Sequence, residues 1–202
     1  MRLEPMTQAH AEPLIAAAND GELWNTEVTI IPPAAGMKDY IEFALDGLAQ
    51  SNQLPFTIIR KADDGASASA PLTGNAGTPP AFDQIVGSTR FYEIFPRDRK
   101  CAIGYTWLSK SAQRSPVNTE CKLLLLTHAF ETWQCVRVEL ITDVLNEQSR
   151  AAILRLGAKQ EGILRRHLIL PKGRVRDSVF FSIIDSEWPD VKERLQNRLR
   201  QT

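Results

Sequence analysis

A short polar turn, Gln113–Thr119 (QRSPVNT), has residue types that could bind an anion in this chain of 202 residues. It follows a predicted strand, Cys101–Leu108, and opens a predicted helix, Asn118–Trp133. The first turn of a helix has backbone N–H groups without intrahelical partners and carries partial positive charge, so it attracts phosphate. Arg114 adds a full positive charge. The turn therefore predicts a site for a phosphate-bearing ligand, with capping of the helix by Asn118 as the structural alternative.

A second polar stretch begins at Asn146 and passes through Ser149 and Ala152 to the pair Leu156-Gly157. Asn is a favoured N-cap, and the residues from Ser149 onward place a packed stripe on one face of the short helix predicted over Gln148–Leu156. A side chain that caps a helix can also face a ligand. Capping and ligand binding are therefore both open for Asn146.

These stretches, in this order, resemble the Gcn5-related N-acetyltransferases, and within them the RimJ/RimL-like branch that acetylates the N-termini of ribosomal proteins. The family holds the pyrophosphate of acetyl-CoA in a turn of the form Q/R-x-x-G-x-G/A. Gln113 matches the first position of that turn, whereas Pro116 and Asn118 stand where the two glycines would be. Because Pro116 has no N–H group, the backbone donors left in the turn are Ser115, Val117, Asn118 and Thr119.

The resemblance implies roles for two further segments. Ile103–Leu108 (IGYTWL) is similar to the family's fourth strand, which splays from the fifth, so the N–H groups of Trp107 and Leu108 would polarise the thioester carbonyl. A buried strand with its aromatic side chains in the core is the structural alternative. The Asn146 amide would reach the pantetheine arm. The cofactor-binding residues expected for acetyl-CoA are Trp107, Leu108, Gln113, Arg114, Ser115, Val117, Asn118, Thr119, Asn146, Ser149 and Ala152.

The reaction implied is direct attack of a neutral amine on acetyl-CoA, which needs a base for the amine and an acid for the departing thiolate. An α-amine titrates at roughly 8, so positioning can supply much of the rate. We take Glu139 as the base, with three further carboxylates as alternatives: Glu27, Glu93 and Asp143. Many family members use a Tyr as the acid. This sequence has Ile153 at that spacing, and Ser149 is the nearest substitute.

The order of predicted elements indicates an α+β fold with one β-α-β unit in the middle. The resemblance, which extends from Arg2 to Pro189, implies the acyl-CoA N-acyltransferase fold. That fold is a mixed, mostly antiparallel twisted sheet of about seven strands with splayed central strands, flanked by helices on both faces. We expect a single N-acetyltransferase domain over residues 1–202, with 62–81 as a mobile loop insertion and 187–201 as a C-terminal helix.

The composition argues against several other classes. The chain is 43% hydrophobic and its formal net charge is zero, so nothing points to nucleic acid or to an anionic membrane. No stretch approaches the roughly 20 apolar residues of a membrane span, and the N-terminus lacks the apolar run of a signal peptide, so we expect the cytoplasm. The odd number of cysteines indicates buried reduced thiols, and the three histidines show no metal-ligand spacing, so no metal is expected.

We therefore expect an N-acetyltransferase that moves an acetyl group from acetyl-CoA to a primary amine, either a small molecule or a protein N-terminus. The alternative is a non-catalytic acyl-CoA-binding regulator, which the missing Tyr and the altered glycines keep open. A nucleic-acid binder that uses the basic residues of Arg165–Arg176 is a third reading, against which the zero net charge counts. The acceptor and the oligomeric state are open, with a homodimer among the states considered.

Overall fold

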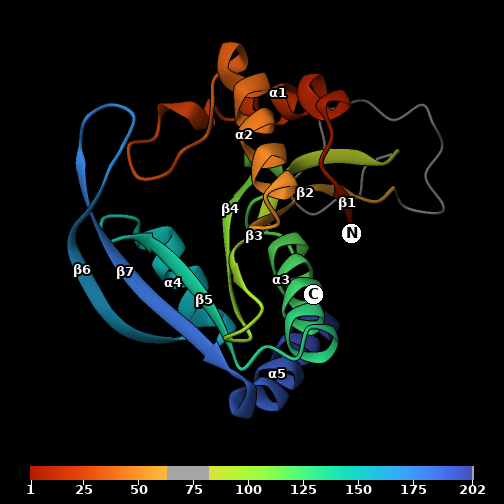
Figure 1. Ribbon diagram of the computed structural model, residues 1–202. Helices are drawn as coiled ribbons and strands as arrows, with labels where there is room; N and C mark the ends of the chain where they lie inside the picture. Colours follow the sequence, from red (N-terminus) through yellow and green to blue (C-terminus); the bar gives the residue numbers. More distant parts are fainter. Residues whose placement is uncertain (63–81, 202) are drawn as a thin grey trace. The chain divides into compact units, whose positions relative to one another are not determined.

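Seven strands form one mixed sheet in the part of the chain that the computed structural model describes, residues 1–62 and 82–201 (Figure 1). Their order across the sheet is β1-β2-β3-β4-β5-β7-β6. This arrangement confirms the predicted mixed sheet. The strands are β1 (Arg2–Pro5), β2 (Gln53–Arg60), β3 (Gln84–Phe95), β4 (Lys100–Leu108), β5 (Arg137–Asp143), β6 (Lys159–Ile169) and β7 (Val175–Ile184).

The α-helices among the described residues are α1 (Ala11–Asn19), α2 (Met37–Ala49), α3 (Val117–Thr127), α4 (Glu147–Leu156) and α5 (Trp188–Arg200). The helix predicted over Asn118–Trp133 is shorter than expected, because the chain changes at His128 to a π-helical turn that runs to Thr132. The Trp133 N–H closes this turn on the His128 carbonyl at 3.0 Å. The wider turn brings the ring of Trp133 to 4.7 Å from that of Phe91, between centroids, so tertiary packing accompanies the change of helix type.

The described residues group into two compact units. The first contains Met1–Asn25, Ile31–Arg90 and Tyr105–Cys121, and the second contains the remaining described segments, Thr26–Ile30, Phe91–Gly104 and Lys122 onward. Strands β3 and β4 and helix α3 each contribute residues to both units. Because three elements continue from one unit into the other, we retain the single domain over residues 1–202 as a proposal.

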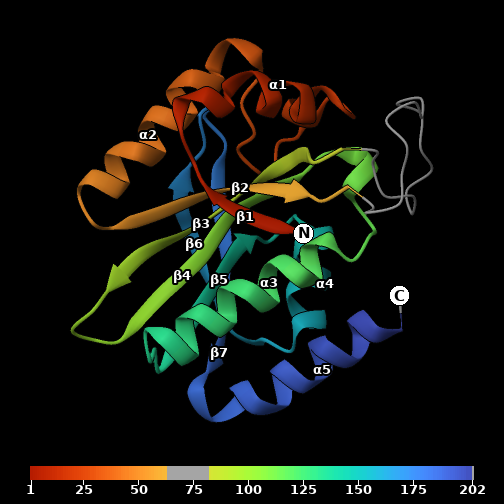
Figure 2. The same cartoon turned by 90° about the vertical axis from the view of Figure 1, so that its right-hand side faces the viewer.

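In the first unit, α1 and α2 lie side by side on β1 and β2 (Figure 2). Apolar residues at helical spacing explain this packing, since Leu14 and Ala18 of α1 and Met37 and Ile41 of α2 are all buried. Strand β1 pairs with β2 in antiparallel register, with Leu3 opposite Ile58. Trp107 of β4 belongs to the same apolar cluster, as the structural alternative for this side chain requires.

In the second unit, β5 pairs with β7 and β7 with β6, both antiparallel, and these three strands lie side by side in Figure 1. Strands β4 and β5 are parallel, and α3 connects them, which confirms the predicted β-α-β unit. Their register consists of three pairs, from Lys100–Arg137 to Ala102–Glu139. Pairing therefore ends at Ala102, well before β4 ends, as expected for splayed central strands.

Helix α5 lies within the predicted C-terminal helix, residues 187–201, and Pro189 occupies its first turn. Its Trp188 ring stacks on that of Phe130, with 5.3 Å between the centroids. The predicted loop insertion, residues 62–81, falls outside the described residues except for Ala62. Among the helices of the described ranges, none has the length and apolar character that spanning a membrane requires.

Candidate functional site

The chain that leaves β4 is braced by the turn that follows α1. Lys110 N–H donates to the Asp20 carbonyl at 2.9 Å, and Ser111 N–H donates to Asp20 Oδ2 at 3.0 Å. A short 3₁₀ helix, Lys110–Ala112, results. A Cβ on Gly21 would lie 2.6 Å from Lys110 Cβ, so the close approach requires the glycine. These two hydrogen bonds to Asp20 fix the backbone between the end of β4 and the polar turn.

The polar turn closes back onto the strand through Gln113. Its Nε2 donates to the Leu108 carbonyl at 3.0 Å, so two residues predicted to bind the cofactor are brought together. Arg114 follows with a φ of 58°, in the left-handed region that favours glycine, and its side chain is exposed. Left-handed backbone therefore occurs in this turn, although its sequence contains no glycine.

Helix α3 begins at Val117, one residue before the predicted start. Asn118 therefore lies inside the helix, and the expectation that it caps the helix is wrong. Pro116 stands at the N-cap position and has no side-chain acceptor. Ser115 precedes it and forms a local turn instead, because its Oγ accepts from Val117 N–H at 3.4 Å and donates to the Ala112 carbonyl at 2.6 Å. Local polarity alone could not fix the first residue of the helix.

The first turn of α3 offers backbone donors to a ligand. The first helical bond runs from Glu120 N–H to the Pro116 carbonyl at 2.9 Å. Helical geometry consequently leaves the N–H groups of Asn118 and Thr119 without a partner inside the helix. Both residues are half-buried, and Arg114 is exposed beside them. These donors and this charge fit a phosphate group.

At the end of β4, some backbone N–H and C=O groups face the neighbouring strand β3 and others face away from it. Ser109 N–H donates to the Val86 carbonyl of β3 at 2.7 Å, and a Cβ on Gly87 would lie 2.0 Å from the Trp107 carbonyl oxygen. Successive residues of a strand direct their N–H and C=O groups to opposite edges. Leu108 therefore directs its N–H away from β3, whereas Trp107 faces β3. Of the two predicted oxyanion donors, the geometry favours Leu108.

In the second unit, Asn146 is the N-cap of α4. Its side chain accepts from Ser149 N–H at 2.9 Å, which confirms the capping alternative. Because the cap occupies Oδ1, the Nδ2 group is the part of the side chain that can donate to a ligand. The residue is half-buried, so both functions are compatible with its position.

The helix that follows carries the remaining predicted residues of this unit. Ser149 and Ala152 are half-buried, whereas Ile153 is 7% exposed and packs in the core. A helix places positions 149, 152 and 153 on one face. Ile153 has no titratable group, so Ser149 is the hydroxyl that this face presents.

Glu139, the predicted base, lies in a network of charges. Its Oε1 accepts from Arg137 Nε at 2.8 Å and lies 3.7 Å from Lys100 Nζ. Arg137 also pairs with Glu161, and these hydrogen bonds lower the pKa of Glu161 to about 2. One oxygen of Glu139 is therefore held by two cations.

The alternative carboxylates have different surroundings. Desolvation raises the pKa of Glu93, and the neighbouring Glu139 raises it further. Asp143 is fully buried and pairs with Arg174, so it holds the β6–β7 hairpin to the end of β5. Glu27 is exposed, and its backbone carbonyl accepts from Arg174 Nη2 at 2.8 Å. These contacts favour Glu93 over Asp143 and Glu27 as a second base.

The cysteines are reduced and buried, as predicted: Cys101, Cys121 and Cys135. Burial raises the pKa of the Cys101 thiol and of the Cys135 thiol, so neither is a ready nucleophile. Within the described ranges, no group of three or more His, Cys, Asp and Glu side chains has the arrangement of a metal site.

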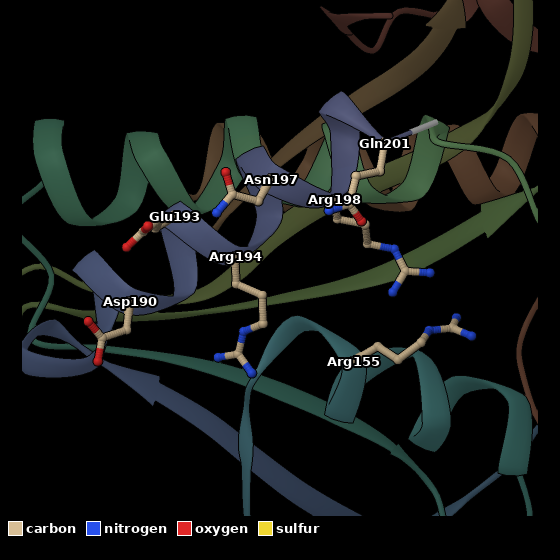
Figure 3. Close-up of a pocket in the computed structure, with 7 residues that line it drawn as sticks. All are labelled: Arg155, Asp190, Glu193, Arg194, Asn197, Arg198 and Gln201. Carbon is tan, nitrogen blue, oxygen red and sulfur yellow. The ribbon is translucent and has the colours of Figure 1, made fainter.

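A groove of about 550 Å³ between α4 and α5 lies apart from the predicted residues (Figure 3). Arginines from both helices line it, among them Arg155 and Arg194, and Figure 3 shows the Arg194 side chain directed toward α4. Gly157, with a φ of 103°, ends α4 there, and a Cβ on it would lie 2.2 Å from Arg194 Nη2. Arg194 is therefore packed against the end of a helix, where a cation is favourable.

The fold and these features identify the class of protein. Residues 1–159 match the model of the "Acetyltransferase (GNAT) domain" family. The match covers most of the 202 residues. The chain belongs to this family of acetyltransferases.

Individual relatives support the same assignment. YdaF of Bacillus subtilis, which carries the provisional name of ribosomal N-acetyltransferase, is 32% identical over 108 residues; the match spans 54% of this chain and 58% of that protein. A crystal structure of an acetyltransferase, provisionally named, from T. thermophilus is 32% identical, with a TM-score of 0.76 over 98% of this chain and 93% of that one. The structure of a GCN5-related N-acetyltransferase from Brucella melitensis is 29% identical, with a TM-score of 0.77 over 97% and 80%.

Proposed function

We propose that this protein transfers an acetyl group from acetyl-CoA to the primary amine of a protein N-terminus, by direct attack in a ternary complex. Membership of the acetyltransferase family supports the reaction class. The observation that carries the proposal is the closed turn at the start of α3, where Gln113 holds Leu108 and the helix directs N–H groups outward.

In this proposal, different predicted residues contact different parts of acetyl-CoA. The N–H groups of Asn118 and Thr119, with the Arg114 guanidinium, bind the pyrophosphate. Leu108 N–H donates to the thioester oxygen, and Asn146 Nδ2 donates to an amide of the pantetheine arm. Acetyl-CoA supplies the activated acetyl thioester. The other predicted residues, Trp107, Gln113, Ser115, Val117, Ser149 and Ala152, shape the turn, the strand end and the helix that carry these donors.

Two side chains of the second unit are proposed to move protons. Glu139 accepts the amine proton through Oε2, directly or by way of one water molecule, and the neighbouring Glu93 carboxylate shares this role. Ser149 Oγ passes its proton to the departing thiolate and regains one from a water molecule, so that the hydroxyl is restored. Because an α-amine needs little help to lose its proton, we expect the base to contribute less than binding and orientation do.

The acceptor class rests on the relative in Bacillus subtilis, whose provisional name specifies ribosomal N-acetylation. Since the match covers just over half of that protein, the acceptor stays a proposal for this chain. The relatives reported above are named as acetyltransferases, so the regulator alternative gains no support from them. The cytoplasmic location and the homodimer also stay predictions, which cell fractionation and light scattering test.

A thiol-release assay tests the function. Purified protein and acetyl-CoA are incubated with short peptides that carry a free N-terminus, with the same peptides blocked at the N-terminus, and with blocked peptides that contain lysine. We expect free CoA to appear only with the free N-termini. Stabilisation by CoA without turnover of any amine would instead establish the non-catalytic regulator.

Substitutions of the proton-moving residues complete the test. We expect Glu139→Gln to lower kcat by about tenfold at neutral pH and by less at high pH, where the amine is already neutral. Glu93→Gln is the matched comparison, because it removes one charge from the same cluster. Unchanged kcat in both variants would remove these carboxylates from the mechanism while leaving the reaction class intact.

A further inference from the structure

A fully buried arginine lies in β3 of the first unit. Arg90 has no exposed surface, and its Nη1 donates to Gln53 Oε1 at 2.8 Å, while Nε and Nη2 have no hydrogen-bond partner. Burying a charge with so few hydrogen bonds is costly unless other groups compensate. Stability alone therefore does not account for an arginine at a core position that methionine or leucine could fill.

Aromatic rings surround the Arg90 guanidinium. Its central carbon lies 4.2 Å from the centroid of the Tyr105 ring, 4.8 Å from that of Tyr40 and 5.8 Å from that of Phe43. Cations are attracted to the faces of such rings, most strongly where water is excluded. A planar guanidinium can also stack on a ring, which a lysine ammonium cannot do. Because the Tyr105 ring is the nearest of the three, it is the main aromatic partner of Arg90.

Tyr105 has an unusual backbone. Its φ is 49°, in the left-handed region, which is costly for a residue with a Cβ. A left-handed residue within a strand is typical of a β-bulge, and we refer to this position of β4 as the bulge. Its carbonyl accepts from Ser88 Oγ at 3.4 Å and from the Tyr40 hydroxyl at 3.5 Å, and these two hydroxyls lie 2.8 Å apart. The ring and the carbonyl of the bulge residue are thus both held from β3 and α2.

The bulge lies between two functionally important points of β4. Pairing with β5 ends at Ala102, three residues before Tyr105, and Leu108 follows three residues after it. A change in φ at Tyr105 would rotate the remainder of the strand, and with it the edge on which Leu108 places its N–H group. Contacts that fix Tyr105 therefore also fix the orientation of Leu108.

We propose that Arg90 is a positioning residue for cofactor binding, which acts with Tyr40 to hold the bulge at Tyr105 and so to orient the Leu108 amide. This inference rests on the proposed function, in which Leu108 contacts acetyl-CoA. Arg90 itself touches neither the cofactor nor the reacting atoms. Its effect is transmitted through the backbone of β4.

The experiment compares Arg90→Met, which removes the charge at similar length, with Tyr40→Phe, which removes one oxygen atom. Lys192→Met is the control, because it removes one positive charge from an ion pair in the second unit, where Lys192 Nζ lies 2.7 Å from Glu131 Oε1. CoA affinity is measured by calorimetry. Hydrogen exchange over residues 103–109 is measured in the ligand-free protein, so that the bulge is probed independently of binding.

We expect Arg90→Met to weaken CoA binding by about tenfold and Tyr40→Phe by about threefold, with faster exchange over 103–109 in both. Lys192→Met should change neither quantity, and Arg90→Lys should fall between Arg90→Met and the unsubstituted protein. A merely structural role would lower the melting temperature of Arg90→Met and leave CoA affinity unchanged, which would overturn the proposal.

Two further outcomes are decisive. If Arg90→Met does not fold, the Tyr40→Phe variant provides the test. Unchanged CoA affinity and unchanged hydrogen exchange over residues 103–109 in Tyr40→Phe would refute the positioning role. If the unsubstituted protein binds no CoA, the proposed function fails and the cofactor part of this inference fails with it. Faster exchange in Arg90→Met would then still show that Arg90 holds the bulge, so the two failures are distinguishable.

Discussion

Gln113 and Leu108 are joined by a hydrogen bond of 3.0 Å from the side-chain Nε2 to the backbone carbonyl. The bond closes the loop between β4 and α3. Replacing Gln113 with Ala removes it, and we expect CoA affinity to fall about fivefold, the equivalent of about 1 kcal/mol. Calorimetric titration with CoA measures the change.

Gln134→Ala is the control for this substitution. Gln134 Nε2 makes a similar bond, to the Glu131 carbonyl at 2.8 Å, but in the second unit and outside the predicted site. We expect a comparable small loss of stability and no loss of CoA affinity. Equal effects of the two variants on CoA binding would mean that closure of the loop has no role in the site.

Arg114 combines a positive charge with left-handed backbone, and two substitutions separate these properties. Arg114→Gly tolerates the φ of 58°, whereas Arg114→Ala leaves it strained, so we expect the alanine variant to be less stable by about 1 kcal/mol. Both variants lose the charge and should show CoA binding that is weaker and less sensitive to salt. Calorimetric titrations with CoA at several salt concentrations measure how steeply the affinity depends on salt. Arg155→Ala, at an exposed position of α4, is the control.

Asn146 caps α4 through Oδ1, and its Nδ2 group is proposed to bind the cofactor. Asn146→Asp keeps an acceptor for the Ser149 N–H but loses the donor, so stability should be preserved while CoA affinity falls. Asn146→Ala should lose both, with a stability cost of about 1 kcal/mol. Thermal unfolding and calorimetry, applied to both variants, measure the two effects. Normal CoA binding by the aspartate variant would restrict Asn146 to capping.

Gly87 permits the close approach of β3 to the end of β4. A Cβ at this position would lie 2.0 Å from the Trp107 carbonyl oxygen, so Gly87→Ala must separate the strands or distort them. We expect a loss of about 3 kcal/mol in unfolding free energy. Gly162→Ala in β6 is the control, since a Cβ there meets nothing within 4 Å. Denaturant titrations compare the two variants.

The pair Glu161–Arg137 predicts a pH dependence of stability. The pKa of Glu161 is lowered from 4.5 to about 2, so the pair's contribution is present above the ordinary value and is lost as the pH falls toward 2. The Glu161 side chain is 41% exposed, so we expect at most about 1 kcal/mol. Unfolding of the protein and of Glu161→Gln at pH 7 and pH 3 should show a difference that shrinks at the lower pH.

Much of the fold was predictable because it depends on local patterns. The turn residues of 113–119, the helix that they start and the cap at Asn146 follow from residue types at short spacing. The family resemblance rested on the same blocks, which explains why the sheet and the reaction class were anticipated. The change to a π-helical turn at His128 was missed, because it accompanies packing between Trp133 and Phe91, residues far apart in the sequence.

The sequence by itself determined the order of elements, the donors at the start of α3 and the presence of Asn146 before α4, since each depends on neighbours along the chain. Tertiary structure decided that Leu108 rather than Trp107 turns its N–H away from β3, that Gln113 closes the loop, and that Arg90 meets Tyr105. These relationships depend on strand register and on side chains from distant segments, and no local pattern encodes them.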